Sequence, residues 1–401
     1  MNKNSLKYTC LFGGGAIRGA SYCGVVKALE ELGVQTDNIA GSSVGSIVAA
    51  LYAVGYNSDE LKEIFNKVNF ELFKDIQLGI GPKLAISKGE VFLEWIRELI
   101  ESKYYGEKHK KGHNKAVTFK DLEKNLYIIT TDLSNFECKE FSKQETADFE
   151  IARAVRISCG MPGLMRPIEY NNTTLVDGDL QKSWPMWKLS KNLLNNKERI
   201  LELRLEGYAE DEGHMNPLSY ANTVYSCITA MATSFIVDIY ADKDKFDYIV
   251  VNTGDILIVD FNISRDKREH LMQMGYEQTL DYFKNILPEK KTKILENYKK
   301  LNYHFLKIKK LIAHNNISKA KIQLGELFTE LPELFSIIDK ADYNDIKNFR
   351  NIFLSNIGFP ALFGKIFLKN EETVIAELNK VTNNISAKIS ELESYLSAYP
   401  A

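Results

Sequence analysis

The feature that most constrains the fold is a serine flanked by glycines at residues 41–45, whose sequence is GSSVG. A short apolar run, residues 37–40, precedes it, and apolar residues at helical spacing follow it until Gly55. A strand, a sharp turn and a helix in this order form a nucleophile elbow, in which small residues around the serine leave room for a strained backbone. We therefore predict that Ser43 is a nucleophile. Taken alone, the pentapeptide could also be an ordinary glycine-rich turn.

A second glycine cluster, GGGA at residues 13–16, follows a strand-like run and opens a helix that ends near Gly33. Backbone N–H groups at such a helix N-terminus attract an anion. Two anions fit this loop: the pyrophosphate of a dinucleotide, and the oxyanion that forms when serine attacks an ester. The oxyanion interpretation uses both glycine clusters at once. It predicts an oxyanion hole formed by Gly13, Gly14, Gly15 and Ala16.

The dinucleotide alternative would make the chain an oxidoreductase. It requires an acidic residue about 20 residues beyond the glycines, at the end of a second strand. Asp37 lies near that distance, but the run that contains it leads directly into the serine turn. The cluster also lacks the Gly-Lys-Ser/Thr ending that indicates a P-loop. We therefore prefer the oxyanion interpretation.

A serine nucleophile needs a base, and Asp177 is the best candidate. It ends a strand-like run at residues 175–177 and precedes Gly178, and a carboxylate there could accept the serine proton. A simple Asp-Gly turn is the alternative interpretation. No histidine has a setting that favours catalysis; the six are His109, His113, His214, His270, His304 and His314.

Taken together, these features resemble the patatin-like phospholipases over roughly residues 5–285. The motifs follow the order and spacing of that family, at residues 12–19, 24–31, 39–53, 131–133, 157–167 and 175–178. The resemblance implies a bacterial-type patatin domain: a three-layer α/β/α sandwich with a mostly parallel sheet and a catalytic dyad of Ser43 and Asp177. It also implies a lipid acyl hydrolase of the phospholipase A or lysophospholipase type.

The reaction implied by this resemblance is a two-step acyl transfer. Asp177 takes the proton of Ser43, the hydroxyl attacks an ester carbonyl, and the glycine loop binds the oxyanion. Water then releases the fatty acid, whereas an alcohol in its place would make the protein an acyltransferase. Arg18 could orient a lipid phosphate in the substrate or pair with a nearby carboxylate. The reaction requires no metal and no cofactor.

Three residues depart from the family pattern. Ala16 stands where the family has a glycine, which narrows the allowed backbone angles. Asp179 adds a carboxylate that could raise the pKa of the presumed base or could face solvent. Ser183 replaces an asparagine that lies two residues before a proline and supports the active-site loop. A catalytically impaired scaffold therefore remains an alternative function.

The first 285 residues alternate strand-like runs with helical patterns, which predicts a mostly parallel sheet covered by helices. A helix at residues 266–283 is expected to close this domain. The strand-like runs lie at residues 8–12, 126–131, 174–176, 200–205 and 248–251.

Residues 286–401 have a helical pattern and form a second predicted region, which could act as a lid or a membrane-surface element. Lysines such as Lys291 surround an apolar stripe, which predicts a packed face and a solvated face; a basic helix on anionic lipid is the alternative. The apolar segment 352–368 is interrupted too often to span a membrane, and could be core, lid or anchor. The stripe comprises Ile294, Tyr298, Leu301, Phe305, Ile308 and Ile312.

The composition and the N-terminal sequence limit the binding partners and the cellular compartment that we expect. A formal net charge of −2 gives no general attraction to nucleic acid, so we expect no nucleic-acid partner. Five scattered cysteines predict reduced thiols. The N-terminus lacks a signal-like apolar stretch, and the sequence contains no apparent transmembrane helix. We therefore expect a cytoplasmic protein that contacts membranes peripherally and acts on phospholipid or another acyl-ester lipid.

Overall fold

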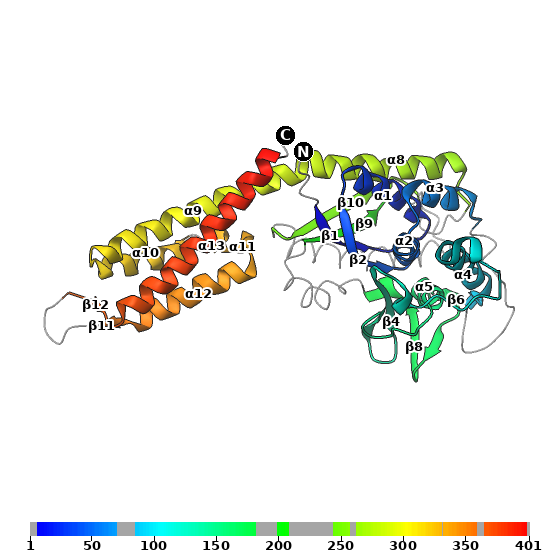
Figure 1. The fold of residues 1–401 in the computed structure, drawn as a ribbon, viewed down its shortest axis with the longest axis horizontal. Coiled ribbons are helices and arrows are strands. Elements are labelled where there is room, and N and C mark those ends of the chain that lie inside the picture. The colour runs from blue at the N-terminus through cyan, green and yellow to red at the C-terminus, as the bar shows by residue number, and fades with distance from the viewer. Residues whose placement is uncertain are drawn as a thin grey trace, which may run out of the picture. The chain divides into compact units, whose positions relative to one another are not determined.

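Figure 1 shows the computed structural model of the chain, which divides into two compact units. One unit contains residues 1–241 and 246–281, and the other contains residues 242–245 and 282–401. Within them, the structure describes residues 6–69, 85–181, 199–207, 244–256, 262–330, 332–358 and 365–398.

The first unit is built on an eight-stranded sheet. Its order is β10 (Phe246–Asn252), β9 (Arg199–Glu206), β1 (Lys7–Phe12), β2 (Gln35–Ser42), β4 (Asn125–Asp132), β8 (Thr173–Asp177) and β7 (Ile168–Tyr170), with β5 (Glu137–Ser142) also paired to β4. Neighbours from β10 to β4 are parallel, whereas β5, β7 and β8 pair antiparallel. All five predicted strand runs lie in this sheet. A separate parallel pair joins β3 (Ala85–Ser87) and β6 (Gly163–Met165).

Helices pack around this sheet (Figure 1). The predicted α/β sandwich with a mostly parallel sheet is therefore confirmed. The helix predicted at residues 266–283 is α8, continued by a π-helical turn at Tyr282–Ile286. Within the described residues, the helices are α1 (Ser21–Glu31), α2 (Val44–Ala53), α3 (Ser58–Lys67), α4 (Glu90–Tyr105), α5 (Ile151–Ser158) and α8 (Arg265–Asp281).

Helices α1 and α8 cross at two glycines. A Cβ atom added at Gly24 would lie 1.7 Å from the carbonyl oxygen of Met272, and one at Gly275 would lie 2.1 Å from that of Ser21. Both distances are shorter than any non-bonded contact, so this close approach of the two backbones requires glycine on each helix.

The described residues of the second unit form helices and a short hairpin. Its helices are α9 (Leu287–Ala313), α10 (Ile317–Glu330), α11 (Pro332–Ile337), α12 (Lys340–Ser355) and α13 (Glu371–Ala398). The predicted C-terminal helical region is confirmed. The antiparallel hairpin of β11 (Ile357–Gly358) and β12 (Phe367–Leu368) is an addition that the apolar pattern did not predict.

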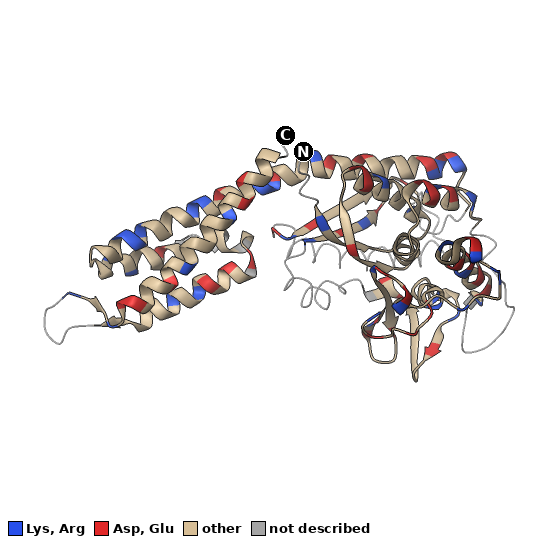
Figure 2. Cartoon of the chain, viewed as in Figure 1, with Lys and Arg blue, Asp and Glu red and all other residues tan. Residues whose placement is uncertain are grey.

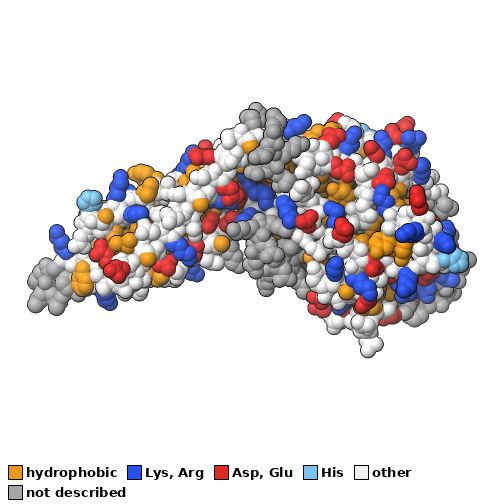
Figure 3. Space-filling view, viewed as in Figure 1, with side chains coloured by type: hydrophobic (Ala, Val, Ile, Leu, Met, Phe, Trp, Pro, Cys, Tyr) orange, Lys and Arg blue, Asp and Glu red, His pale blue; other side chains and the backbone are white. Residues whose placement is uncertain are grey.

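The apolar stripe of α9 packs in the core of the second unit, as predicted, because all six of its side chains are buried. Phe353 and Ile357, from the apolar segment, belong to the same core, while residues 359–364 lie outside the described residues. Figure 2 shows lysines along α9, and all of them except Lys291 are exposed or half-buried. On the face of the second unit seen in Figure 3, apolar side chains are scattered among charged ones.

Lys291 is an exception to the predicted solvated face. It is buried and pairs with the carboxylate of Asp244, which also lies 2.5 Å from the Nζ atom of Lys388. The prediction for Lys291 was wrong because an acidic partner, distant in sequence, compensates for burial of its charge. Among the described helices of the chain, none has the length and apolarity needed to cross a bilayer.

Candidate active site

Ser43 occupies a sharp turn between the end of β2 and the start of α2. Its backbone has φ 49° and ψ −131°, a strained conformation for a residue with a side chain. A Cβ atom at Gly45 would lie 2.1 Å from the carbonyl oxygen of Phe12, and one at Gly41 would lie 2.4 Å from that of Gly45. The strand, turn and helix predicted around Ser43 are present, and both flanking glycines are required by contact with backbone.

The hydroxyl of Ser43 donates a hydrogen bond to Oδ2 of Asp177 at 2.8 Å. Both side chains are buried, with 5% and 1% of their surfaces exposed. These two predicted site residues are separated by 134 positions in the sequence. The structure therefore brings the predicted nucleophile and the predicted base into direct contact.

The sheet register explains this contact. Strand β2 pairs with the first part of β4 and ends where Ser42 lies opposite Ile129. Strand β8 approaches from the opposite direction and ends where Asp177 lies opposite Thr130, the next residue of β4. Because β2 and β8 meet end to end along β4, the residue that follows Ser42 lies beside Asp177.

Two further hydrogen bonds fix the dyad. The backbone N–H of Asp179 donates to Oδ1 of Asp177 at 2.8 Å, which orients the carboxylate. The N–H of Ser43 donates to the hydroxyl of Ser158 at 3.0 Å. Ser158 stands at the end of α5 within a motif of the resemblance, but nothing in its sequence setting indicated this contact.

The glycine loop is only partly available to an oxyanion. The N–H of Gly13 donates to the carbonyl oxygen of Leu203 at 3.0 Å, which extends the pairing of β1 with β9. The N–H of Gly14 donates to Oδ1 of Asp179 at 3.2 Å. Within the described part of the chain, the N–H groups of Gly15 and Ala16 form no hydrogen bond. Of the four N–H groups predicted to bind an oxyanion, those of Gly13 and Gly14 are therefore already hydrogen-bonded within the protein.

Gly15 and Ala16, whose N–H groups form no hydrogen bond within the described residues, also have positive φ angles. Gly15 has φ 150°, and Ala16 has φ 46° at the start of the short 3-10 helix η1 (Ala16–Ala20). Ala16 thus adopts the left-handed backbone that a glycine would reach without strain. Its N–H remains at a helix N-terminus despite the substitution.

Arg18 is held by the fold. Only 6% of its surface is exposed, its Nε atom donates to the carbonyl oxygen of Ile256 at 2.6 Å, and its Nη2 atom donates to that of Gly207 at 3.0 Å. Burial lowers the pKa of Arg18, and the carboxylate of Glu206 acts in the opposite direction. Arg18 therefore joins η1 to the segments that follow β9 and β10.

Asp179 does not face solvent, which excludes one of the two interpretations of this residue. It is 1% exposed, and its Oδ1 atom also accepts a hydrogen bond from the hydroxyl of Ser42 at 3.1 Å. The solvent-facing prediction was wrong because Asp179 turns inward beneath the glycine loop. Ser183, the third departure from the family pattern, lies outside the described residues.

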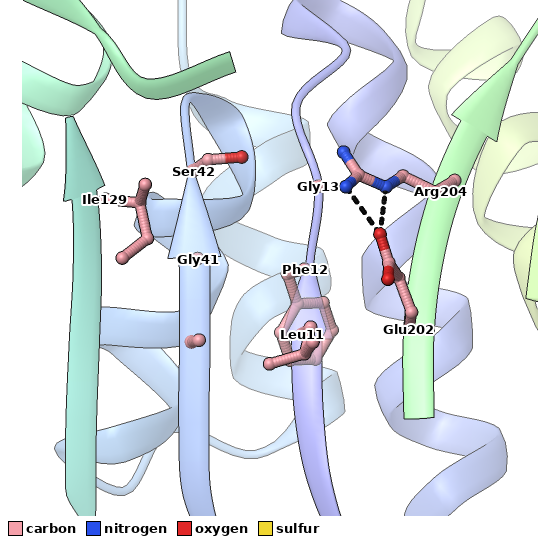
Figure 4. Close-up of a pocket in the computed structure, with 9 residues that line it drawn as sticks. Leu11, Phe12, Gly13, Gly41, Ser42, Ile129, Glu202 and Arg204 are labelled. Carbon is pink, nitrogen blue, oxygen red and sulfur yellow. Dashed lines mark hydrogen bonds and ion pairs between the residues drawn. The ribbon is translucent and has the colours of Figure 1, made fainter. Parts of the chain in front are cut away.

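Glu202 and Arg204 form a buried ion pair on β9 that the sequence analysis missed (Figure 4). The pair is 2.5 Å long, and Nη1 of Arg204 lies 3.5 Å from Oδ1 of Asp179. Burial alone would lower the pKa of Arg204, but the carboxylates of Glu202 and Asp179 raise it above its usual value. The available signal was two charges of opposite sign, two residues apart, among the apolar residues in the interior of β9.

The described histidines do not contact the dyad. His109 pairs with Glu98 at 3.0 Å, and His304 lies 3.4 Å from Gln323; the other described ones, His113, His270 and His314, are exposed. His214 lies outside the described residues.

The four described cysteines are free, as predicted. Burial raises the pKa of Cys159, whose thiol lies 3.2 Å from the carbonyl oxygen of Ser43.

A nucleophile elbow and a glycine-rich loop on a mostly parallel sheet are the arrangement of an α/β acyl hydrolase. Comparison with known families specifies the class further. Residues 11–185 match the model of the patatin-like phospholipases, which identifies a patatin-like domain in this part of the chain. Lipid acyl hydrolysis is the activity that this match supports.

The chain is also similar to individual proteins. The chain is 24% identical to the uncharacterized protein YqhO of Bacillus subtilis over 287 residues, which cover 67% of this chain and 95% of that protein. It is 30% identical to the lysophospholipase NTE1 of Saccharomyces cerevisiae over 183 residues, which cover 45% of this chain and 10% of that protein. The crystal structure of VipD from Legionella pneumophila has a similar fold, with a TM-score of 0.50, 15% identity, and coverage of 96% of this chain and 90% of VipD.

Proposed function

We propose that this protein hydrolyses the carboxylic esters of lipids through an acyl-enzyme formed on Ser43. The observation that carries this proposal is the 2.8 Å hydrogen bond from the Ser43 hydroxyl to Asp177 in a patatin-like domain. A serine attacks an ester readily only when a positioned base removes its proton. Asp177 is the described group that accepts a hydrogen bond from this hydroxyl.

In the first step, Oγ of Ser43 forms a bond to the ester carbonyl carbon while Asp177 accepts the hydroxyl proton. The carbonyl oxygen becomes negatively charged, and the N–H groups of Gly15 and Ala16 donate hydrogen bonds to it. The bond between the carbonyl carbon and the alcohol oxygen then breaks. Asp177 returns the proton to the departing alcohol, which leaves an acyl-serine.

In the second step, water replaces the alcohol. Asp177 accepts a proton from the water, the water oxygen attacks the acyl-serine, and the same two N–H groups stabilise the oxyanion. The fatty acid leaves and the proton returns to Ser43. Transfer to an alcohol instead of water would use the same groups and is the acyltransferase alternative.

We propose phospholipid or lysophospholipid as the substrate class. The support is the family description and the printed name of the yeast relative, a lysophospholipase. We assign the chemistry to residues 5–285. For residues 286–401 we propose a role as a lid or at a membrane surface, because a substrate that resides in a bilayer requires the enzyme to approach lipid.

Release of fatty acid from vesicles tests this function. Full-length protein is mixed with phosphatidylcholine vesicles or lysophosphatidylcholine, with and without glycerol as acyl acceptor, and the products are measured by mass spectrometry. We expect free fatty acid from the wild type and from Ser318→Ala, an exposed serine control, but not from Ser43→Ala. Acyl-glycerol as the main product would indicate an acyltransferase, and no turnover by folded wild type would indicate a scaffold.

A further inference from the structure

Asp179 contacts three parts of the site at once. Its Oδ1 atom accepts hydrogen bonds from the N–H of Gly14 at 3.2 Å and from the hydroxyl of Ser42 at 3.1 Å. Its own N–H donates to Asp177 at 2.8 Å. One residue therefore links the glycine loop, the strand end that precedes Ser43, and the carboxylate of the dyad.

The negative charge of Asp179 has a buried counter-ion. Arg204 lies 3.5 Å away and also pairs with Glu202, and all three side chains are at most 6% exposed. Figure 4 shows Ser42 on β2 and the guanidinium of Arg204 on β9, with Gly13, which follows β1, between them. A buried carboxylate is stable only when it is paired and hydrogen-bonded, and Asp179 meets both conditions.

The glycine loop fits closely against these charged side chains. A Cβ atom at Gly14 would lie 2.5 Å from Cγ of Asp179, and one at Gly13 would lie 2.8 Å from Cδ of Arg204. Gly14 does not have a positive φ, so its backbone conformation is open to alanine. An alanine there would be excluded only by its steric overlap with Asp179. Position 14 therefore requires glycine because the side chain of Asp179 occupies the space that a side chain there would need.

We propose that Asp179 is a positioning residue for ester hydrolysis, one that holds the glycine loop from behind so that the N–H groups of Gly15 and Ala16 meet the oxyanion. This inference rests on the proposed function. The N–H of Gly14 is engaged by Asp179 and serves as the attachment point of the loop. Because Ser42 and Ser43 are consecutive, the same carboxylate also fixes the strand end that carries the nucleophile.

Steady-state kinetics of full-length variants test this role. Asp179→Asn and Asp179→Gly should lower kcat by about tenfold or more, because oxyanion stabilisation is sensitive to donor position, while KM changes by less than about twofold. Asp247→Asn is the matched control: Asp247 is buried and pairs with Arg199 at 2.6 Å, at the opposite ends of the strands. We expect that variant to lose stability and to keep the wild-type kcat.

A double-mutant cycle between Gly14 and Asp179 tests the same role through sterics. Gly14→Ala alone should lower kcat at least about tenfold, because its Cβ would overlap Asp179 and displace the loop. In the Asp179→Gly background, the same alanine has room and should lower kcat little further. Equal effects of Gly14→Ala in both backgrounds would overturn the inference.

These outcomes separate the two proposals. If wild type hydrolyses lipid ester, Ser43→Ala does not, and Asp179→Asn has the wild-type kcat, the positioning role is wrong and the proposed function stands. If folded wild type turns over no ester, the proposed function is wrong, and the role of Asp179 is overturned with it. A loss of kcat in the Asp179 variants that Asp247→Asn reproduces would also overturn the positioning role.

Discussion

The hydroxyl of Ser158 joins the nucleophile turn to the sheet: it accepts the N–H of Ser43 at 3.0 Å and donates to the carbonyl oxygen of Ile129 at 2.5 Å. Ser158 is fully buried. The strained backbone at Ser43 is thus tied to β4, the strand against which Asp177 also ends. This relationship explains how a residue with an unfavourable φ can be held in one position.

Ser158→Ala should therefore weaken both stability and catalysis. It leaves the N–H of Ser43 and the carbonyl oxygen of Ile129 without this partner, which we expect to cost about 1–3 kcal/mol of unfolding free energy. Urea denaturation measures that loss, and kcat should fall with it because the turn loses its attachment. Wild-type kcat in a destabilised Ser158→Ala would contradict this role.

Asp177→Asn should remove the base without changing the shape of the site. An amide cannot take the proton of Ser43, so we expect kcat to fall by about 10²–10⁴-fold with little change in KM. Asp37→Asn is a suitable control because Asp37 is exposed and pairs with Lys7 at the surface. Equal activities of Asp177→Asn and the control would show that another group acts as the base.

Gly45→Ala should be strongly destabilising. The added Cβ would lie 2.1 Å from the carbonyl oxygen of Phe12 and 2.5 Å from that of Gly13, and backbone atoms cannot move aside as a flexible side chain can. We expect a loss of about 3 kcal/mol or more in thermal or urea unfolding.

Gly325→Ala provides the opposite case for the same substitution. Gly325 lies in helix α10 with no heavy atom within 4 Å of an added Cβ. Alanine there should stabilise the helix by up to about 1 kcal/mol. Similar effects of the two alanines would refute the steric account of the elbow.

His304 should make stability depend on pH. Burial, and then the nearby charge of Lys307, lower the pKa of His304 below its usual value. The unfolded chain therefore binds a proton at His304 more readily than the folded chain does. The stability associated with neutral His304 is present above the ordinary histidine pKa of about 6.5 and is lost as pH falls through the lowered pKa of the folded state. His304→Gln should reduce the fall in melting temperature between neutral and mildly acidic pH, whereas the exposed His113→Gln should not.

The sequence predicted the elements that carry local signals. The strand before Ser43, the helix after it and the apolar stripe of α9 follow from hydrophobic periodicity. Asp177 was found because it ends a strand-like run within a family motif. These features depend on near neighbours in the chain, and the structure places them as expected.

Long-range charge pairing could not be predicted in the same way. Asp179 was open to a solvent-facing interpretation because its partner Arg204 lies 25 positions away on a strand of another part of the sheet. Lys291 was assigned to a solvated face because nothing near it in the sequence identifies Asp244 as its partner. The hydrogen bonding of each N–H in the glycine loop depends on such partners, so the sequence alone could not predict which of the four are engaged.

Covalent labelling with a fluorophosphonate tests the central claim most directly. The probe reacts with activated serines, and peptide mass spectrometry of the full-length protein identifies the labelled residue. We predict a label on Ser43 that disappears in Ser43→Ala and persists in Ser318→Ala. Folded wild-type protein that takes no label, or takes it equally in Ser43→Ala, would contradict the assignment of Ser43 as the nucleophile.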